Sequence, residues 1–148
     1  MPRTFRLCLR PEDAGRVEDL LRADGFDLQP DPCFPLARRA VHEPSPLGSS
    51  LAARFGLIYI QDRSSMLPAA CLDPHPGARV LDACASPGGK TGMAASLAGD
   101  AGFVLALEPN PSRLGTLRRN LERTSRLNTA TLGARGESAV VPWERFAL

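Results

Sequence analysis

Residues 82–91, with the sequence DACASPGGKT, contain the residue types from which a nucleotide-type binding loop is built. They follow the apolar run 78–81 and precede the helix-like stretch 93–98. Strand, acidic residue, glycine turn and helix, in this order, form a ligand pocket at the carboxyl edge of an open α/β sheet. Gly88 and Gly89 would let the backbone approach a ligand closely, and the helix start would direct free N–H groups at a negative group.

Glu108 would form a second wall of the same pocket. It ends the apolar stretch 103–107, which we expect to be a buried strand, and follows the glycine turn by about twenty residues. An acid at this place in a nucleotide-binding unit accepts hydrogen bonds from both ribose hydroxyls. We therefore expect Glu108 to bind the ribose of a ligand; the alternative is an exposed acid that caps the following helix.

Two common phosphate-binding templates do not fit this loop. The sequence contains no G-x-G-x-x-G, and a Walker loop that ends at Lys90 and Thr91 would need glycine where Cys84 stands. This disfavours a nucleotide hydrolase. Lys90 is the only lysine among the 18 basic residues, and a compact ammonium can point at one oxygen in a pocket too tight for a guanidinium.

The whole string resembles the first motif of the Nop/Sun family of RNA cytosine-5 methyltransferases, D-x-C-A-A-P-G-G-K-T, with Ser86 in place of one alanine. Residues 56–69 resemble the lead-in segment of that family, and residues 106–123 resemble its second motif and following helix. The resemblance implies S-adenosylmethionine as cofactor, with Glu108 on the ribose and Arg113 also lining the site. The methionine part of the cofactor would be wrapped by Cys84, Ala85, Ser86, Pro87, Gly88, Gly89 and Lys90.

The resemblance also shows which chemistry this sequence lacks. The family forms 5-methylcytosine through a thiolate that adds to carbon 6 of an unstacked base. Its two cysteine motifs, T-C-S and D-x-P-C-S, lie beyond the third core strand, and this sequence ends where a fourth would begin. We therefore expect no catalytic residue in the chain, which would be the N-terminal part of a longer enzyme and inactive alone. Gly133 stands at the probable position of an Asp that contacts adenine in the family.

The four cysteines, Cys8, Cys33, Cys71 and Cys84, have no paired close spacing. This pattern indicates reduced thiols and neither a disulfide framework nor a metal site. We expect Cys8 and Cys71 to be buried as small apolar residues. For Cys84, a packing role within the loop is favoured over a nucleophilic one.

The pattern of the whole chain predicts an α/β protein with a Rossmann-like fold preceded by a small α+β region, and the resemblance implies that this fold is an incomplete methyltransferase fold. Residues 1–45 would form that small region, ending in a proline-rich connector from residue 27 onward, and residues 46–148 the first part of the methyltransferase domain. Alternating strands and helices of these lengths imply right-handed crossovers and a parallel sheet. The expected strands are 5–10, 56–60, 79–83, 103–107 and 129–132, and the expected helices are 11–24, 64–72, 89–97 and 111–125.

Composition sets the remaining expectations. The net charge of +2 does not by itself indicate a nucleic-acid partner, and 43% hydrophobic residues are enough for a core. No apolar stretch approaches the roughly 18 residues of a membrane span, and the start lacks a secretory signal, so a cytoplasmic protein is favoured. Residues 47–50 and 59–62 most resemble the bacterial ribosomal RNA methyltransferase F type, which makes ribosomal RNA the favoured partner and transfer RNA the second. The alternative is a non-catalytic short form that binds cofactor or RNA.

Overall fold

The computed structural model describes residues 2–139, 144 and 146. The chain divides into two compact units, Met1–Arg63 and Ser64–Leu148. Sequence analysis placed the boundary earlier, after residue 45. The strand Ile58–Ile60 pairs antiparallel with the strand Arg3–Leu7, so the segment after residue 45 completes the sheet of the first unit.

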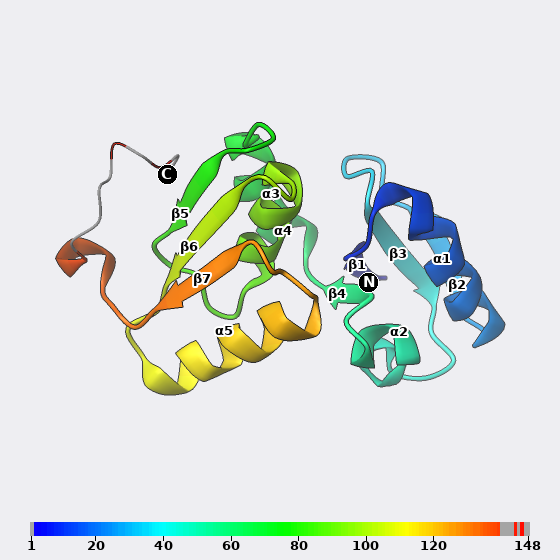
Figure 1. The fold of residues 1–148 in the computed structure, drawn as a ribbon. Helices are drawn as coiled ribbons and strands as arrows, with labels where there is room; N and C mark the ends of the chain where they lie inside the picture. Colours follow the sequence, from blue (N-terminus) through cyan, green and yellow to red (C-terminus); the bar gives the residue numbers. More distant parts are fainter. Residues whose placement is uncertain (1, 140–143, 145, 147–148) are drawn as a thin grey trace. The chain divides into compact units, whose positions relative to one another are not determined.

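The first unit is an antiparallel sheet in the order β2-β3-β1-β4 with helices packed on it (Figure 1). Its predicted helix is confirmed: Val17 and Leu21 are buried against Phe5 and Leu7 of the sheet. Gly25, with φ +88°, ends that helix in the left-handed conformation. The elements of this unit are β1 (Arg3–Leu7), α1 (Ala14–Ala23), β2 (Asp27–Pro30), β3 (Ala37–His42), α2 (Leu51–Arg54) and β4 (Ile58–Ile60), with 3-10 turns at Pro11–Asp13 and Leu47–Ser49.

The predicted proline-rich connector is wrong, because the segment from residue 27 onward contains the two strands β2 and β3. They pair with each other, and β3 pairs with β1. Pro30 is tolerated because β2 is the edge strand of the sheet, where a missing N–H breaks no ladder between two partners. The sequence of β2 and β3 shows no strand periodicity. These segments are strands because the tertiary fold places them beside pairing partners.

The second unit is a parallel sheet in the order β5-β6-β7, as predicted. The strands and helices expected after residue 77 are all present, with almost unchanged ends. In chain order the elements are α3 (Arg63–Leu72), β5 (Arg79–Asp82), α4 (Gly89–Ala98), β6 (Phe103–Leu107), α5 (Pro111–Arg123) and β7 (Thr129–Leu132), followed by a 3-10 turn at Gly136–Ser138.

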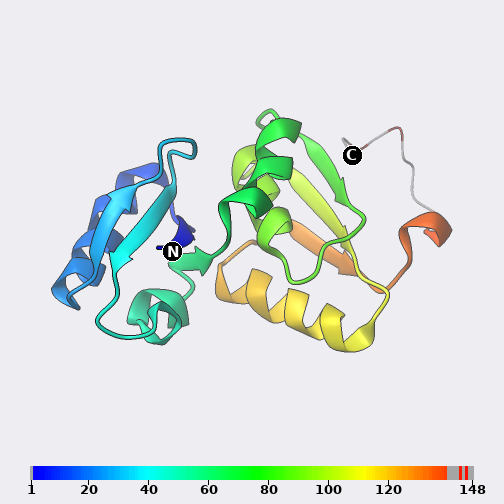
Figure 2. The same cartoon turned by 180° about the vertical axis from the view of Figure 1, so that it is seen from behind.

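Helices α4 and α5 cover the same face of this sheet. Both connections step across the sheet in one direction, so right-handed crossovers bring both helices to one side, the side nearer the viewer in Figure 2. Ala106 packs there against Leu117 and Leu121 of α5. Side chains alternate along a strand, and Leu107 accordingly packs with Leu81 in a separate cluster.

Within the described residues, β5 is paired on one side only, by β6. Sequence analysis expected a fourth strand to begin in residues 143–148, and these lie outside the described part of the chain except for Glu144 and Phe146. No helix in the described part is long and apolar enough to cross a membrane.

Candidate functional site

The loop after β5 is tied together by Asp82, the last residue of that strand. One carboxylate oxygen of Asp82 accepts a hydrogen bond from the Cys84 backbone N–H at 3.1 Å, and the other accepts from the Thr91 hydroxyl at 2.7 Å. Thr91 is fully buried in the first turn of α4. Asp82 therefore joins the end of the strand to the start of the helix and fixes the path of the loop between them.

Gly88 is the turning point of the loop and needs to be glycine for two reasons. Its φ is +107°, in the region that side chains rarely adopt. A Cβ atom here would also lie 3.1 Å from Cδ1 of Leu117. The backbone of the loop therefore packs directly on α5, and α4 begins at the next residue, Gly89.

Three hydrogen bonds fasten the loop to α5. The Ser86 hydroxyl donates to the carbonyl oxygen of Arg113 at 3.0 Å, and Nη2 of Arg113 donates back to the Ser86 carbonyl at 3.4 Å. Nδ2 of Asn120 donates to the Pro87 carbonyl at 2.8 Å. The Ser86–Pro87 peptide is cis. Ala85, at 3% exposure, packs with Leu117 in the same core cluster.

Glu108 lies at the carboxyl end of β6 and is 2% exposed. Its Oε1 accepts a hydrogen bond from the Asn110 backbone N–H at 2.9 Å, and its Oε2 lies 3.2 Å from Nη2 of Arg113. Asn110 also caps α5 by accepting from two backbone N–H groups of the first turn. Each carboxylate oxygen has a second lone pair, so Glu108 is held in place and can still accept from a ligand.

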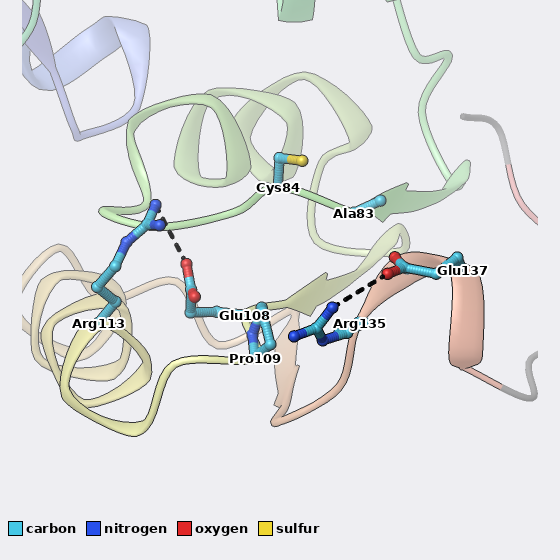
Figure 3. Close-up of a pocket in the computed structure, with 8 residues that line it drawn as sticks. Ala83, Cys84, Glu108, Pro109, Arg113, Arg135 and Glu137 are labelled. Atoms are coloured by element: carbon cyan, nitrogen blue, oxygen red, sulfur yellow. Dashed lines mark ion pairs between the residues drawn. The ribbon is translucent and has the colours of Figure 1, made fainter.

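The loop and Glu108 border one pocket of about 250 Å³, shown in Figure 3. Of the predicted residues, Cys84, Glu108 and Arg113 line it. Residues 85–90 do not: Ala85, Gly88 and Gly89 are buried beneath the loop surface, and Lys90 is exposed. The Lys90 side chain forms no hydrogen bond or ion pair within the part of the chain that the structure describes. The pocket is lined by Ala83, Cys84, Glu108, Pro109, Arg113, Arg135, Gly136 and Glu137.

Sequence analysis missed the wall that follows β7. Arg135 and Glu137 line the pocket and form an ion pair of 3.7 Å in which each side chain is 72% exposed. Gly133, taken as the probable Asp position, does not line the pocket. The sequence could have predicted this wall. Parallel strands end at the same edge of a sheet, so the residues that follow β7 lie beside the loops that follow β5 and β6.

Two expectations about cysteines are wrong. Cys71 and Cys84 are both exposed, whereas Cys8 is buried as expected. Cys84 therefore lines the pocket and is not a packing residue: Asp82 captures its backbone N–H and turns the chain outward at this point. Cys71 lies near the end of α3, a helix that buries Met66 and Ala69 and leaves Cys71 on its outer side.

Comparison with known proteins finds relatives of this sequence. Residues 69–139 match the family model described as 16S rRNA methyltransferase RsmB/F. Over 117 residues, 75% of this chain, the sequence is 42% identical to ribosomal RNA small subunit methyltransferase F of Salmonella paratyphi B. In sequence, the chain is similar to the RsmB/F methyltransferases. It spans about a quarter of the length of the curated relatives that it matches, 24% in this case.

Solved structures of methyltransferases are similar to this chain. A methyltransferase homologue from Pyrococcus horikoshii has a TM-score of 0.83 and 34% identity, over 91% of this chain and 44% of that one. NSun6 from Pyrococcus horikoshii, solved with SFG, has a TM-score of 0.78 over 89% of this chain and 57% of that one. At 15% identity the second match shows the shared fold alone.

Proposed function

We propose that this chain is the S-adenosylmethionine-binding part of an RNA (cytosine-5) methyltransferase that acts on ribosomal RNA. The observation that carries the proposal is the buried Glu108 carboxylate, held at the end of β6 beside the glycine loop that follows β5. The names of the RsmB/F relatives support methyl transfer to ribosomal RNA. Transfer RNA is the second candidate substrate.

The residues present fit the cofactor. Glu108 would accept hydrogen bonds from the ribose hydroxyls, and Arg113 would hold the carboxylate in position for them. The loop from Cys84 to Lys90 would hold the methionine part, and Gly88 lets this loop pack directly on Leu117 of α5, which a Cβ would prevent. At the third wall, Arg135 and Glu137 offer polar groups to a ligand.

Bound S-adenosylmethionine would supply an electrophilic methyl group on its sulfonium centre. The residues of this chain would bind and orient it, and none of them would attack the base. The sequence contains neither T-C-S nor D-x-P-C-S, and Cys84 lies in the loop that would hold the cofactor. We therefore propose that the chain on its own binds cofactor and transfers no methyl group.

The test is a calorimetric titration of the purified 148-residue chain with S-adenosylmethionine, and with ATP as the competing ligand class. We expect saturable binding of the first and none of the second. Glu108→Gln, which keeps the shape and removes the charge, should weaken binding about tenfold through the loss of one charge-assisted hydrogen bond. Glu122→Gln, at an exposed glutamate of α5 outside the pocket, is the matched control and should bind like the wild type.

A methyl-transfer assay tests whether the chain on its own is inactive, as proposed. Incubation with radiolabelled cofactor and ribosomal RNA should give no 5-methylcytosine, and its formation would contradict the proposed division of labour. Saturable binding of RNA without any binding of cofactor would favour the alternative, a non-catalytic RNA-binding protein. Hydrolysis of ATP would instead place the chain among nucleotide hydrolases.

A further inference from the structure

Asn120 makes a contact that reaches from the last turn of α5 to the glycine loop without entering the pocket. Its Nδ2 donates to the Pro87 carbonyl at 2.8 Å, across 33 positions of sequence. The Asn120 Cβ lies 3.8 Å from the place where a Cβ of Gly88 would stand. Asn120 is half-buried and does not line the pocket. It therefore touches the loop at the residue just before the turning point.

The contact belongs to a set of three that fasten two consecutive residues of the loop to α5. Ser86 and Arg113 exchange two hydrogen bonds, at 3.0 and 3.4 Å, and Asn120 adds the third through Pro87. Arg113 has a second task, since the same Nη2 lies 3.2 Å from Oε2 of Glu108. Among the described residues, the Asn120 side chain has no such link to Glu108, so we expect its effect on a ligand to pass through the loop.

We propose that Asn120 is a positioning residue for the cofactor: it holds the Pro87 carbonyl and thereby fixes Gly88 and Gly89 in the conformation that binds. The proposal rests on the proposed function for its ligand, S-adenosylmethionine. Ordering the loop before binding removes an entropic cost that the ligand would otherwise bear. Loss of the Asn120 amide should therefore weaken binding even though no atom of Asn120 reaches the pocket.

The chain contains a matched control in Asn128. Its Nδ2 also donates to backbone carbonyls, those of Ala95 at 2.9 Å and Gly99 at 3.0 Å. Both acceptors lie at the far end of α4, away from the loop. The substitutions Asn120→Asp and Asn128→Asp remove the same kind of donor and leave the same shape. A merely structural contribution should appear in both variants, and a positioning role only in the first.

The experiment measures two properties of the full chain for wild type and both variants. The first is hydrogen–deuterium exchange without ligand, read at the Gly88 amide, which donates to the Ala85 carbonyl at 2.8 Å. The second is the Kd for S-adenosylmethionine. We expect Asn120→Asp to speed exchange at Gly88 and to raise Kd about tenfold, the worth of one hydrogen bond. Thermal unfolding serves as the fold control: we expect Asn128→Asp to lower Tm at least as much as Asn120→Asp does, and to leave Gly88 exchange and Kd unchanged.

Each result has a defined meaning. Unchanged Gly88 exchange in Asn120→Asp overturns the proposal, as does faster exchange with an unchanged Kd. Equal effects of the two variants on Kd would reduce Asn120 to a stabilising contact. If the wild type itself binds no cofactor, the proposed function fails, and Gly88 exchange still decides whether Asn120 orders the loop. Asn120→Ala gives a second measure if the new carboxylate prevents folding.

Discussion

The pocket is bordered by two Arg–Glu pairs that have the same chemistry and very different surroundings. Glu108 is 3% exposed in its side chain and lies 3.2 Å from Arg113. Glu137 lies 3.7 Å from Arg135, and both of these side chains are 72% exposed (Figure 3). The first pair is anchored by the end of β6 and by a backbone N–H of Asn110, whereas the second lies on a 3-10 turn.

The two pairs differ in burial, and we infer that burial, more than pairing, makes the Glu108 carboxylate the better ligand-binding group. An exposed ion pair is screened by water and loses side-chain entropy when it forms, so it contributes little. A buried carboxylate held by neighbours keeps one orientation, and a ligand that donates to it does not have to order it first. We infer that the Glu108 side of the pocket provides affinity and that the Arg135–Glu137 side contributes only modestly.

The largest effect is expected from Glu108→Ala. It removes both acceptor oxygens proposed to bind ribose, so the affinity for S-adenosylmethionine should fall about a hundredfold, equivalent to two charge-assisted hydrogen bonds. Calorimetry on the purified chain measures this, with circular dichroism to verify the fold. A loss below threefold would contradict the unequal roles of the two pairs.

Gly88→Ala tests whether the conformation of the glycine loop beside Glu108 is needed for stability and for cofactor binding. A Cβ at φ +107° and 3.1 Å from Leu117 Cδ1 should cost about 2 kcal/mol of unfolding free energy and also weaken ligand binding. Urea denaturation gives the first quantity. Gly115→Ala is the control, because its Cβ would meet only the flexible end of Arg119, at 3.5 Å. In a helix interior this second change should stabilise by about 0.5–1 kcal/mol.

Arg113→Ala measures the contribution of the Arg113–Glu108 ion pair to cofactor affinity while the Glu108 carboxylate stays in place. Because the Arg113 side chain is 62% exposed, its ion pair is partly screened, and the affinity for cofactor should fall only about fivefold. Arg118→Ala serves as the control on the same helix, since Arg118 contacts Thr131 and does not line the pocket. An Arg113 effect as large as that of Glu108→Ala would show that the guanidinium binds the ligand directly.

The smallest effect is expected from Glu137→Ala. With an exposed partner at 3.7 Å, its removal should change the affinity for cofactor by less than about twofold and the unfolding free energy by less than about 0.5 kcal/mol. The same calorimetric titration measures it beside Glu108→Ala. A tenfold loss would mean that the wall after β7 recognises the ligand and that burial does not set the ranking.

The sequence alone predicted the second unit well because its signals are local. The strands Arg79–Asp82, Phe103–Leu107 and Thr129–Leu132 are apolar runs or short stretches set between turns, and the helix from Pro111 has an apolar stripe. Glu108 could be placed because the end of a strand and the distance from the glycine turn are both countable in the sequence.

The first unit shows the opposite case. The strands β2 and β3 exist because they find partners in an antiparallel sheet, and a proline-rich stretch without periodicity gives no sign of this. The exposure of Cys71 and Cys84 was missed for a related reason. Which side of a helix or loop faces the core depends on what packs on it, and that information lies in other segments of the chain.

The sequence by itself therefore determined the glycine loop, the acid at the end of the next strand and the order of helices and strands between them. Only the tertiary structure decided which residues meet: Asn120 with Pro87 across 33 positions, Arg113 with both Ser86 and Glu108, and Arg135 and Glu137 at the third wall. The physical reason is that backbone conformation follows from neighbours along the chain, whereas burial and side-chain partners arise when distant segments pack together.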